Sequence, residues 1–226
     1  MEKYINIIKN SKLFFNMTKQ EIYNVINCLN ANIKTYKKGE TILNSGDVIK
    51  NIAIIIEGTI YLEKEDFLGN KTIFCEAYQN DIFGASYCYD DEPVPFNVIS
   101  LTNSIVMFLD IKKVFDVSLN CCNSNIKISK NFLYIVLEKN KNLNKKLEHI
   151  SQRTTRNKLV SYLSEQAFKN KSNEFSIKFN RQQLADYLCI DRSAMSNELS
   201  KMRKEKMLDF NKNYFVLNKN FGDLNY

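Results

Sequence analysis

Histidine occurs only once in this 226-residue sequence, and the six cysteines include no CxxC pair. Zinc sites and iron–sulfur clusters draw their ligands from such residues, usually at short spacings. His149 is the only histidine that could ligate a haem or another metal ion, and no HxH pattern occurs. No Walker loop, GxGxxG or GxSxG motif occurs. We therefore expect no metal, no bound cofactor and no enzymatic activity.

Long apolar runs are also missing. No stretch of about 18 apolar residues is present, so the sequence predicts no transmembrane helix. The first residues, Met1–Tyr4, lack the basic start and apolar centre of a signal peptide. We expect a cytoplasmic protein whose cysteines are free thiols. For the neighbours Cys121 and Cys122, ordinary thiols are favoured over a redox-active pair.

Glycine and proline are scarce and unevenly placed. Five of the six glycines fall between residues 33 and 110, where Pro93 and Pro95 mark an exposed loop. Short segments rich in β-branched and aromatic residues run between these turn residues. This pattern is typical of a roll or barrel of short antiparallel strands. Leu68–Lys71 predicts a hairpin turn, because Gly and Asn tolerate positive φ.

Helical periodicity flanks the β-rich region. Residues 18–29 place apolar side chains on one face, and Thr18 with Glu21 predicts a capping box. A heptad begins at Ile126, and the asparagine at one of its a positions favours a two-stranded parallel coiled coil. The alternative is an amphipathic helix that packs on its own domain. His149, at a c position, is expected at the surface. The residues expected at the dimer interface are Leu133, Val136, Asn140, Leu143 and Leu147.

The positive charge is concentrated in the last third of the chain. Residues 1–149 contain 18 basic and 17 acidic residues, a net charge of +1, whereas residues 150–226 contain 14 and 8, a net charge of +6. A basic domain beside a neutral one indicates a polyanionic partner for the basic one. A merely Lys-rich, soluble domain would show the same excess.

Residues 180–208 have the pattern of a helix-turn-helix. Asn180 and Gln183 predict a capping box, residues 189–191 a short turn, and Asp191 the cap of a second helix. A small residue, Ala185, allows the two helices to cross closely. Residues 207–217 predict a β-hairpin with Lys212 at its tip, which would make the motif a winged helix. The side chains expected to face inward are Leu184, Ala185, Leu188, Met195, Leu199 and Met202.

The outward side of the second helix carries hydrogen-bonding side chains that suit base edges. Arginine matches guanine O6 and N7, and asparagine matches adenine N6 and N7. A solvated helix face is the alternative for each residue taken singly. Arg192, Ser193, Ser196 and Asn197 are the candidate base readers, and Arg181, Gln182, Lys201, Arg203, Lys204 and Lys212 the candidate phosphate contacts.

Over nearly its full length the sequence resembles the CRP/FNR family of bacterial regulators, in particular clostridial-type members. The segments GETILNSGD and IIIEGTIYL resemble its cyclic-nucleotide-binding-type domain, and RQQLADYLCIDRSAMSNEL resembles its DNA-binding motif. The resemblance implies that Arg192, Ser193 and Asn197 read bases. Two positions depart from the family pattern. Cys189 replaces a frequent glycine, which implies either a strained backbone or a different turn. Glu198 replaces an apolar residue and is expected to face outward and contact DNA.

The effector region departs further from cyclic-AMP-binding relatives. The family's ribose-binding glutamate and phosphate-binding arginine are both missing from the corresponding segments, 84–86 and 95–97. A buried phosphate without a cation would be poorly compensated, so we expect no tight binding of cyclic AMP. An unknown small molecule, or none, would occupy this region. The candidate effector residues are Phe83, Gly84, Ala85, Ser86, Phe96 and Asn97.

Together these features predict an α+β protein in three parts: a β-roll sensor (1–125), a dimerisation helix with its hinge (126–150), and a winged helix-turn-helix (151–226). The expected function is a homodimeric transcription regulator that reads an inverted repeat in double-stranded DNA, with RNA polymerase as a further partner. The alternative function that involves no enzymatic activity is a ligand-binding module that acts through protein partners.

Overall fold

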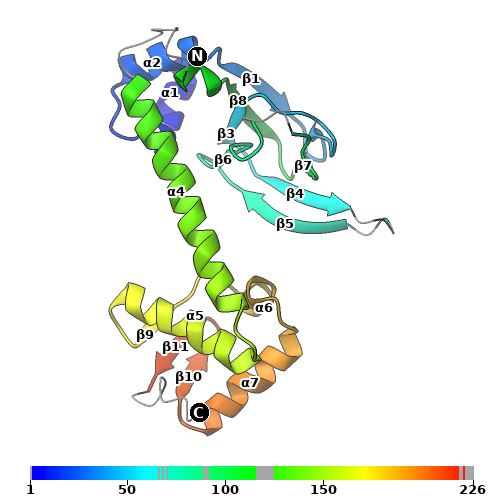
Figure 1. Ribbon diagram of the computed structural model, residues 1–226, viewed down its shortest axis with the longest axis vertical. Coiled ribbons are helices and arrows are strands. Elements are labelled where there is room, and N and C mark those ends of the chain that lie inside the picture. The colour runs from blue at the N-terminus through cyan, green and yellow to red at the C-terminus, as the bar shows by residue number, and fades with distance from the viewer. Residues whose placement is uncertain are drawn as a thin grey trace. The chain divides into compact units, whose positions relative to one another are not determined.

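The computed structural model describes residues 2–65, 67, 69, 71–88, 92–115, 125–218 and 221 (Figure 1). The expected turn at Leu68–Lys71 lies partly outside the described residues, and Cys121 and Cys122 lie wholly outside them. The chain divides into two compact units, Met1–Leu137 and Glu138–Tyr226, each with apolar clusters of its own. None of the helices in the described part of the chain has both the length and the apolarity needed to cross a membrane.

The first unit begins with three short helices, α1 (Glu2–Ile8), η1 (Lys12–Phe14) and α2 (Lys19–Cys28). The capping box predicted for α2 is confirmed. The backbone N–H of Glu21 donates to Thr18 Oγ1 at 3.2 Å, and the backbone N–H of Thr18 donates to Glu21 Oε2 at 2.7 Å. The apolar face of α2 is buried through Ile22, Val25 and Ile26.

Two four-stranded antiparallel sheets follow (Figure 1). One has the order β1-β8-β3-β6 and the other β2-β7-β4-β5. The strands are β1 (Asn32–Tyr36), β2 (Thr41–Leu43), β3 (Ile52–Glu57), β4 (Ile60–Glu65), β5 (Lys71–Ala77), β6 (Ile82–Phe83), β7 (Asn97–Ser100) and β8 (Ser104–Leu109). The predicted roll of short antiparallel strands is thereby confirmed.

Strand β3 is buried on both faces, which explains its unbroken apolar run. Successive side chains of a strand point to opposite faces. Accordingly Ile52, Ile54 and Ile56 join a cluster with α1 and α2, whereas Ala53 and Ile55 join a cluster with residues of both sheets. One strand therefore links the two apolar cores of this unit.

Gly58, between β3 and β4, is required by its backbone conformation and its surroundings. Its φ is +93°, and a Cβ atom there would lie 2.3 Å from Ser104 Oγ and 2.6 Å from the carbonyl oxygen of Asn103. Any other residue would clash and be strained. The tight connection joins β3 of one sheet to β4 of the other.

The first unit ends with α3 (Lys112–Phe115) and the N-terminal part of α4 (Asn125–Ile150). Ile128 and Ile135 of α4 are buried in the cluster that contains α1 and α2. Asn131 Nδ2 donates to the carbonyl oxygens of Leu13 and Phe15, each at 2.9 Å. This part of α4 thus packs on its own domain along one face.

The second unit contains the rest of α4, α5 (Thr155–Asn170), β9 (Glu174–Ser176), α6 (Arg181–Leu188), α7 (Arg192–Lys204), β10 (Leu208–Asn211) and β11 (Tyr214–Leu217). The three strands form an antiparallel sheet of order β10-β11-β9. A single apolar cluster unites the helices with this sheet and includes Leu163, Leu199 and Phe215. With the antiparallel roll of the first unit, this arrangement confirms the predicted α+β fold class.

Candidate nucleic-acid interface

Helix α6 begins and ends as its sequence predicts. Gln183 N–H donates to Asn180 Oδ1, and Asn180 N–H donates to Gln183 Oε1, each at 2.9 Å. At the other end Cys189 has φ 51° and ψ 55°, the left-handed conformation. The departure from glycine at this position therefore carries the expected backbone strain. Lys158 Nζ donates to the carbonyl oxygen of Leu188 at 3.2 Å and so satisfies part of this helix end.

Helix α7 follows the turn and is anchored at its start by Asp191. The backbone N–H of Ala194 donates to Asp191 Oδ1 at 2.9 Å. Hydrogen bonds from Ser193 and the backbone lower the pKa of Asp191 below its ordinary value, so the cap stays ionised at neutral pH. The inward face is fully buried through Met195, Leu199 and Met202.

The opposite face of α7 is solvent-exposed, as the helix-turn-helix interpretation requires. The Ser196 hydroxyl donates to the carbonyl oxygen of Arg192 at 2.9 Å, which leaves its oxygen as an acceptor. The exposed residues on this face include Arg192, Ser193, Ser196, Asn197 and Lys201. The first turns of the helix therefore present donors and acceptors together, over a rigid apolar base.

Two of the expected phosphate contacts, one on α6 and one on the β10–β11 hairpin, lie at the surface. Gln182 is exposed on α6, where its Nε2 donates to Asp186 Oδ1 at 2.8 Å. Lys212 is exposed at the tip of the β10–β11 hairpin, in the left-handed conformation with φ 53°. The pairing of Asn211 with Tyr214 confirms the predicted hairpin, so the motif has a wing.

Arg181 is placed differently from the other candidates. Its guanidinium carbon lies 4.6 Å from the centre of the Phe210 ring and 5.1 Å from that of Phe215. Both Nη atoms are buried and have no hydrogen-bond partner among the described residues, and burial lowers the pKa of the guanidinium. In this conformation Arg181 packs on the wing by cation–π contact, and its guanidinium is not presented to a phosphate.

Arg203 also packs on the wing. Its guanidinium carbon lies 4.9 Å from the Phe210 ring centre, its Nη2 donates to the Phe210 carbonyl oxygen at 3.2 Å, and it forms an ion pair with Asp209. Phe210 is thus in contact with two arginines, one from each helix of the motif.

Glu198 of α7 does not face outward, and the expectation that it contacts DNA is wrong in this structure. Its Oε1 accepts from Arg156 Nε at 2.6 Å, and its side chain is 20% exposed. The same guanidinium donates to both carboxylate oxygens of Glu205. A carboxylate replaces the family's apolar residue here because an arginine of α5 compensates its charge.

His149 is buried, with 2% of its surface exposed, which contradicts the expected surface position. Its Nδ1 lies 2.8 Å from Ser161 Oγ and its Nε2 lies 3.0 Å from Glu165 Oε2. Burial would raise the pKa of Glu165, but hydrogen bonds from Lys145, Lys169 and His149 outweigh it and lower that pKa to about 2. The heptad position gives the face of α4 on which His149 lies. It carries no information about α5, whose Ser161 and Glu165 cover that face.

The expected dimer residues lie on exposed parts of α4. In the first unit Leu133 is 56% exposed and Val136 is 39% exposed. In the second unit Leu143 is 66% exposed, Leu147 is 60% exposed, and the exposed Asn140 accepts a hydrogen bond from Asn144 at 2.9 Å. Large apolar side chains at such exposure are typical of a surface that is covered by a partner.

The candidate effector residues lie among packed side chains of the roll. Phe83 and Phe96 belong to the cluster that contains residues of both sheets, and the Phe96 ring meets Tyr87 edge-to-face with centroids 5.5 Å apart. Asn97 Oδ1 accepts from the backbone N–H of Ser45 at 2.8 Å. Gly84, with φ +83°, begins the turn that contains Ala85 and Ser86. The side chains around Phe83 and Phe96 are apolar. The side-chain carbonyl of Asn97 already accepts a hydrogen bond within the roll.

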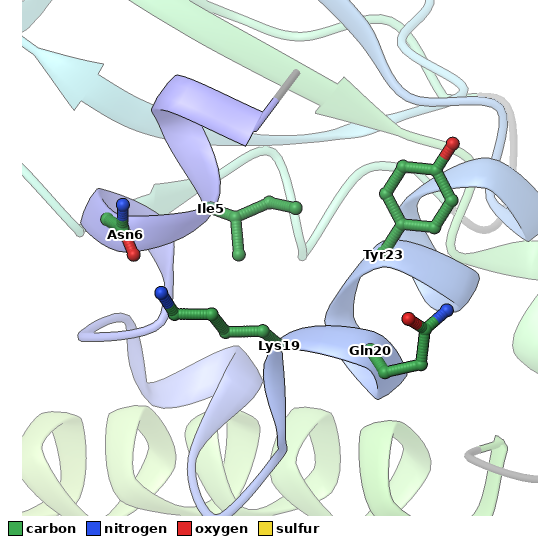
Figure 2. Close-up of a pocket in the computed structure, with 5 residues that line it drawn as sticks. All are labelled: Ile5, Asn6, Lys19, Gln20 and Tyr23. Carbon is green, nitrogen blue, oxygen red and sulfur yellow. The ribbon is translucent and has the colours of Figure 1, made fainter.

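A cavity of about 310 Å³ lies elsewhere in the first unit, between α1 and α2 (Figure 2). Ile5 and Asn6 line it from α1, and Lys19, Gln20 and Tyr23 line it from α2. None of the candidate effector residues contributes to it.

Comparison with known families agrees with this architecture. Residues 33–120 match the cyclic nucleotide-binding domain, and residues 157–220 match the Crp-like helix-turn-helix domain. The two matches follow one another in the order of the two units and together span more than half of the chain. The chain belongs to the CRP/FNR family of transcription regulators. As a member, it is a DNA-binding transcription regulator; proteins of this family are regulators rather than enzymes.

Solved structures of CRP/FNR regulators share the fold across most of their length. CprK in complex with OCPA is 14% identical, with 91% of this chain and 94% of that chain covered and a TM-score of 0.61. The c-di-GMP responsive regulator CLP of Xanthomonas campestris is 12% identical, with 88% and 99% covered and a TM-score of 0.57. The catabolite activator protein of Thermus thermophilus is 15% identical, with 92% and 94% covered and a TM-score of 0.54. No curated protein sequence matches the chain significantly.

Two features of the regulator escaped the sequence interpretation. The contacts of Arg156 with Glu198 and Glu205 span 42 and 49 residues, and those of His149 with Ser161 and Glu165 join two helices. One feature of the sequence pointed to the contacts of Arg156. Glu198 stands where the family has an apolar residue, and a carboxylate beside a buried helix face needs a cation.

Proposed function

We propose that this CRP/FNR regulator works as a homodimer that reads an inverted repeat through the exposed face of α7. The observation that carries the proposal is the contrast between the two sides of that helix. Met195, Leu199 and Met202 are fully buried, whereas Arg192 and Asn197 are exposed in the first turns. Only the N-terminal part of a recognition helix reaches deep into the major groove.

In this proposal, phosphate contacts supply affinity and base contacts supply sequence choice. Gln182, Lys201, Lys204 and Lys212 are exposed in the same unit, and their side chains suit phosphate oxygens. The net charge of +6 in residues 150–226 supports this role, because neutralised phosphates release counterions and make binding salt-dependent.

Dimerisation is proposed through the exposed heptad positions of α4, which include Leu133, Val136, Asn140, Leu143 and Leu147. Two copies would place their recognition helices about 34 Å apart, one turn of B-DNA. The functional division that follows assigns sensing to residues 1–125, dimerisation to 126–150 and DNA recognition to 151–226. RNA polymerase is the proposed further partner of the DNA-bound dimer.

Any effector of the roll is proposed to be a molecule other than cyclic AMP. The region of Phe83, Gly84, Ala85, Ser86, Phe96 and Asn97 lacks the carboxylate and the arginine that a ribose phosphate needs. Among the solved relatives, CprK is complexed with OCPA and CLP is responsive to c-di-GMP, so one fold accompanies different ligands.

Selection from a pool of random DNA duplexes tests the proposal although the operator sequence is not known. The wild-type chain is expected to enrich a motif with two-fold symmetry whose half-sites are centred one helical turn apart. Sedimentation with the enriched duplex is expected to give two chains per duplex. Failure to enrich any motif, or enrichment of an unrepeated site bound by one chain, would refute it.

A further inference from the structure

Arg156, the second residue of α5, makes three hydrogen bonds to the recognition helix and its C-terminal cap. Its Nε donates to Glu198 Oε1 at 2.6 Å, its Nη1 to Glu205 Oε2 at 2.7 Å, and its Nη2 to Glu205 Oε1 at 3.0 Å. The pair with Glu205 is bidentate, a geometry that fixes direction as well as distance. One side chain therefore contacts α7 near its middle and at its end.

The two carboxylates lie on the same flank of the helix. Residues seven apart complete nearly two turns, so Glu198 and Glu205 point to almost the same side and lie about 10 Å apart along the axis. This flank borders the buried face and leaves Arg192 and Asn197 exposed. An attachment on this flank, away from the helix axis, resists rotation about that axis, and the second attachment also prevents the helix from tilting about the first.

The covering of this cluster distinguishes it from an ordinary surface ion pair. Exposed pairs contribute little because solvent screens them and both side chains remain mobile. Here the side chain of Arg156 is 26% exposed and that of Glu198 is 20% exposed, whereas Glu205 at the helix end is 37% exposed. The hydrogen bond from Arg156 also lowers the pKa of Glu205, so the carboxylate remains charged and paired at neutral pH.

We infer that Arg156 is a positioning residue for DNA recognition: by holding Glu198 and Glu205, it sets the rotation of α7 and so selects which base edges Arg192 and Asn197 meet. This inference rests on the proposed function. It assigns Arg156 an effect on sequence choice that exceeds its effect on overall affinity, although Arg156 itself touches no DNA.

The test compares Arg156→Met and Arg156→Lys with the wild-type chain and with Arg153→Met. Arg153 is exposed in the segment just before α5, so its replacement removes the same charge without touching α7. The measured quantity is the ratio of affinities for the motif enriched by the wild type and for a scrambled duplex, at fixed salt. Circular dichroism spectra establish that each variant is folded.

Arg156→Met is expected to lower this ratio about tenfold, the cost of one misplaced base contact, and Arg153→Met to leave it unchanged. Arg156→Lys keeps the charge but cannot bridge both carboxylates, so an intermediate loss is expected; this variant decides the matter if Arg156→Met does not fold. A wild type that enriches no motif would refute the proposed function itself. A wild type with a clear motif and an Arg156→Lys variant of equal ratio would refute only the positioning role.

A triple variant separates orientation from charge. Removal of Arg156 leaves two uncompensated carboxylates that repel phosphates, and Glu198→Gln with Glu205→Gln removes that repulsion. In the Arg156→Met background these changes are expected to restore affinity for scrambled DNA but not the affinity ratio. Full recovery of the ratio would show that Arg156 acts only by charge compensation and would overturn the inference.

Discussion

The outward face of α7 and the interior of the β-roll are built in opposite ways. The helix face is exposed and polar, and it stands on three fully buried apolar side chains. The candidate effector region is apolar and packed, with Phe83 and Phe96 inside a cluster that contains residues of both sheets. The comparison teaches that a DNA-reading surface can be recognised from the free chain, because its groups already point outward. A small-molecule site cannot be recognised in the same way when its lining residues also serve as core.

The largest expected effect tests the packed character of the roll. Phe96→Ala should lower the free energy of unfolding by about 3–5 kcal/mol, since it removes a buried aromatic ring. Phe15→Ala, at a residue 72% exposed, is the matched control and should change it by less than about 0.5 kcal/mol. Urea unfolding of the full chain measures both. Equal, small losses would show that Phe96 lines an open site and would remove the contrast between the two regions.

The second-largest effect is expected on the outward face of α7. Arg192→Ala should weaken binding to the enriched motif by about 1–3 kcal/mol and relax choice at one base pair. Lys204→Ala, on the same helix, should weaken binding to all duplexes alike and reduce the salt dependence by about one counterion. Competition shifts at several salt concentrations distinguish the two. If Arg192→Ala discriminated as well as the wild type, Arg192 would not be a base reader.

The sequence predicted local features well and long-range polar contacts poorly. Both capping boxes, Thr18 with Glu21 and Asn180 with Gln183, depend on residues three apart, so a pattern alone reveals them. The burial of His149 depends on Ser161 and Glu165 in the next helix, and helical periodicity carries no information about such a partner. The packing of Arg181 on Phe210 joins α6 to the wing in the same way.

A smaller effect should appear in acid. The pKa of Glu165 is lowered to about 2 from an ordinary 4.5, so the unfolded chain binds more protons than the folded one between these values. Stability from this cluster is therefore complete above about pH 5 and is lost as the pH falls toward 2. Glu165→Gln should reduce the loss of stability over this interval, as followed by urea unfolding at stepped pH. An unchanged pH dependence would show that the cluster makes no such contribution.

Cyclic AMP is expected to have no effect, because it should not bind to the roll. Titration calorimetry with cyclic AMP should give no binding at micromolar concentrations, because the roll supplies neither the carboxylate nor the arginine for a ribose phosphate. Micromolar affinity would show that other groups replace them and would place a polar site within the apolar interior.

Methylation interference can establish whether the exposed face of α7 reads bases in the major groove. Guanines of the enriched duplex are methylated at N7, an acceptor that only the major groove presents. We expect methylation to block binding at two guanine positions, one in each half-site, about one helical turn apart. Arg192→Ala is expected to lose this sensitivity. Binding that tolerates N7 methylation at every position would contradict base reading by α7.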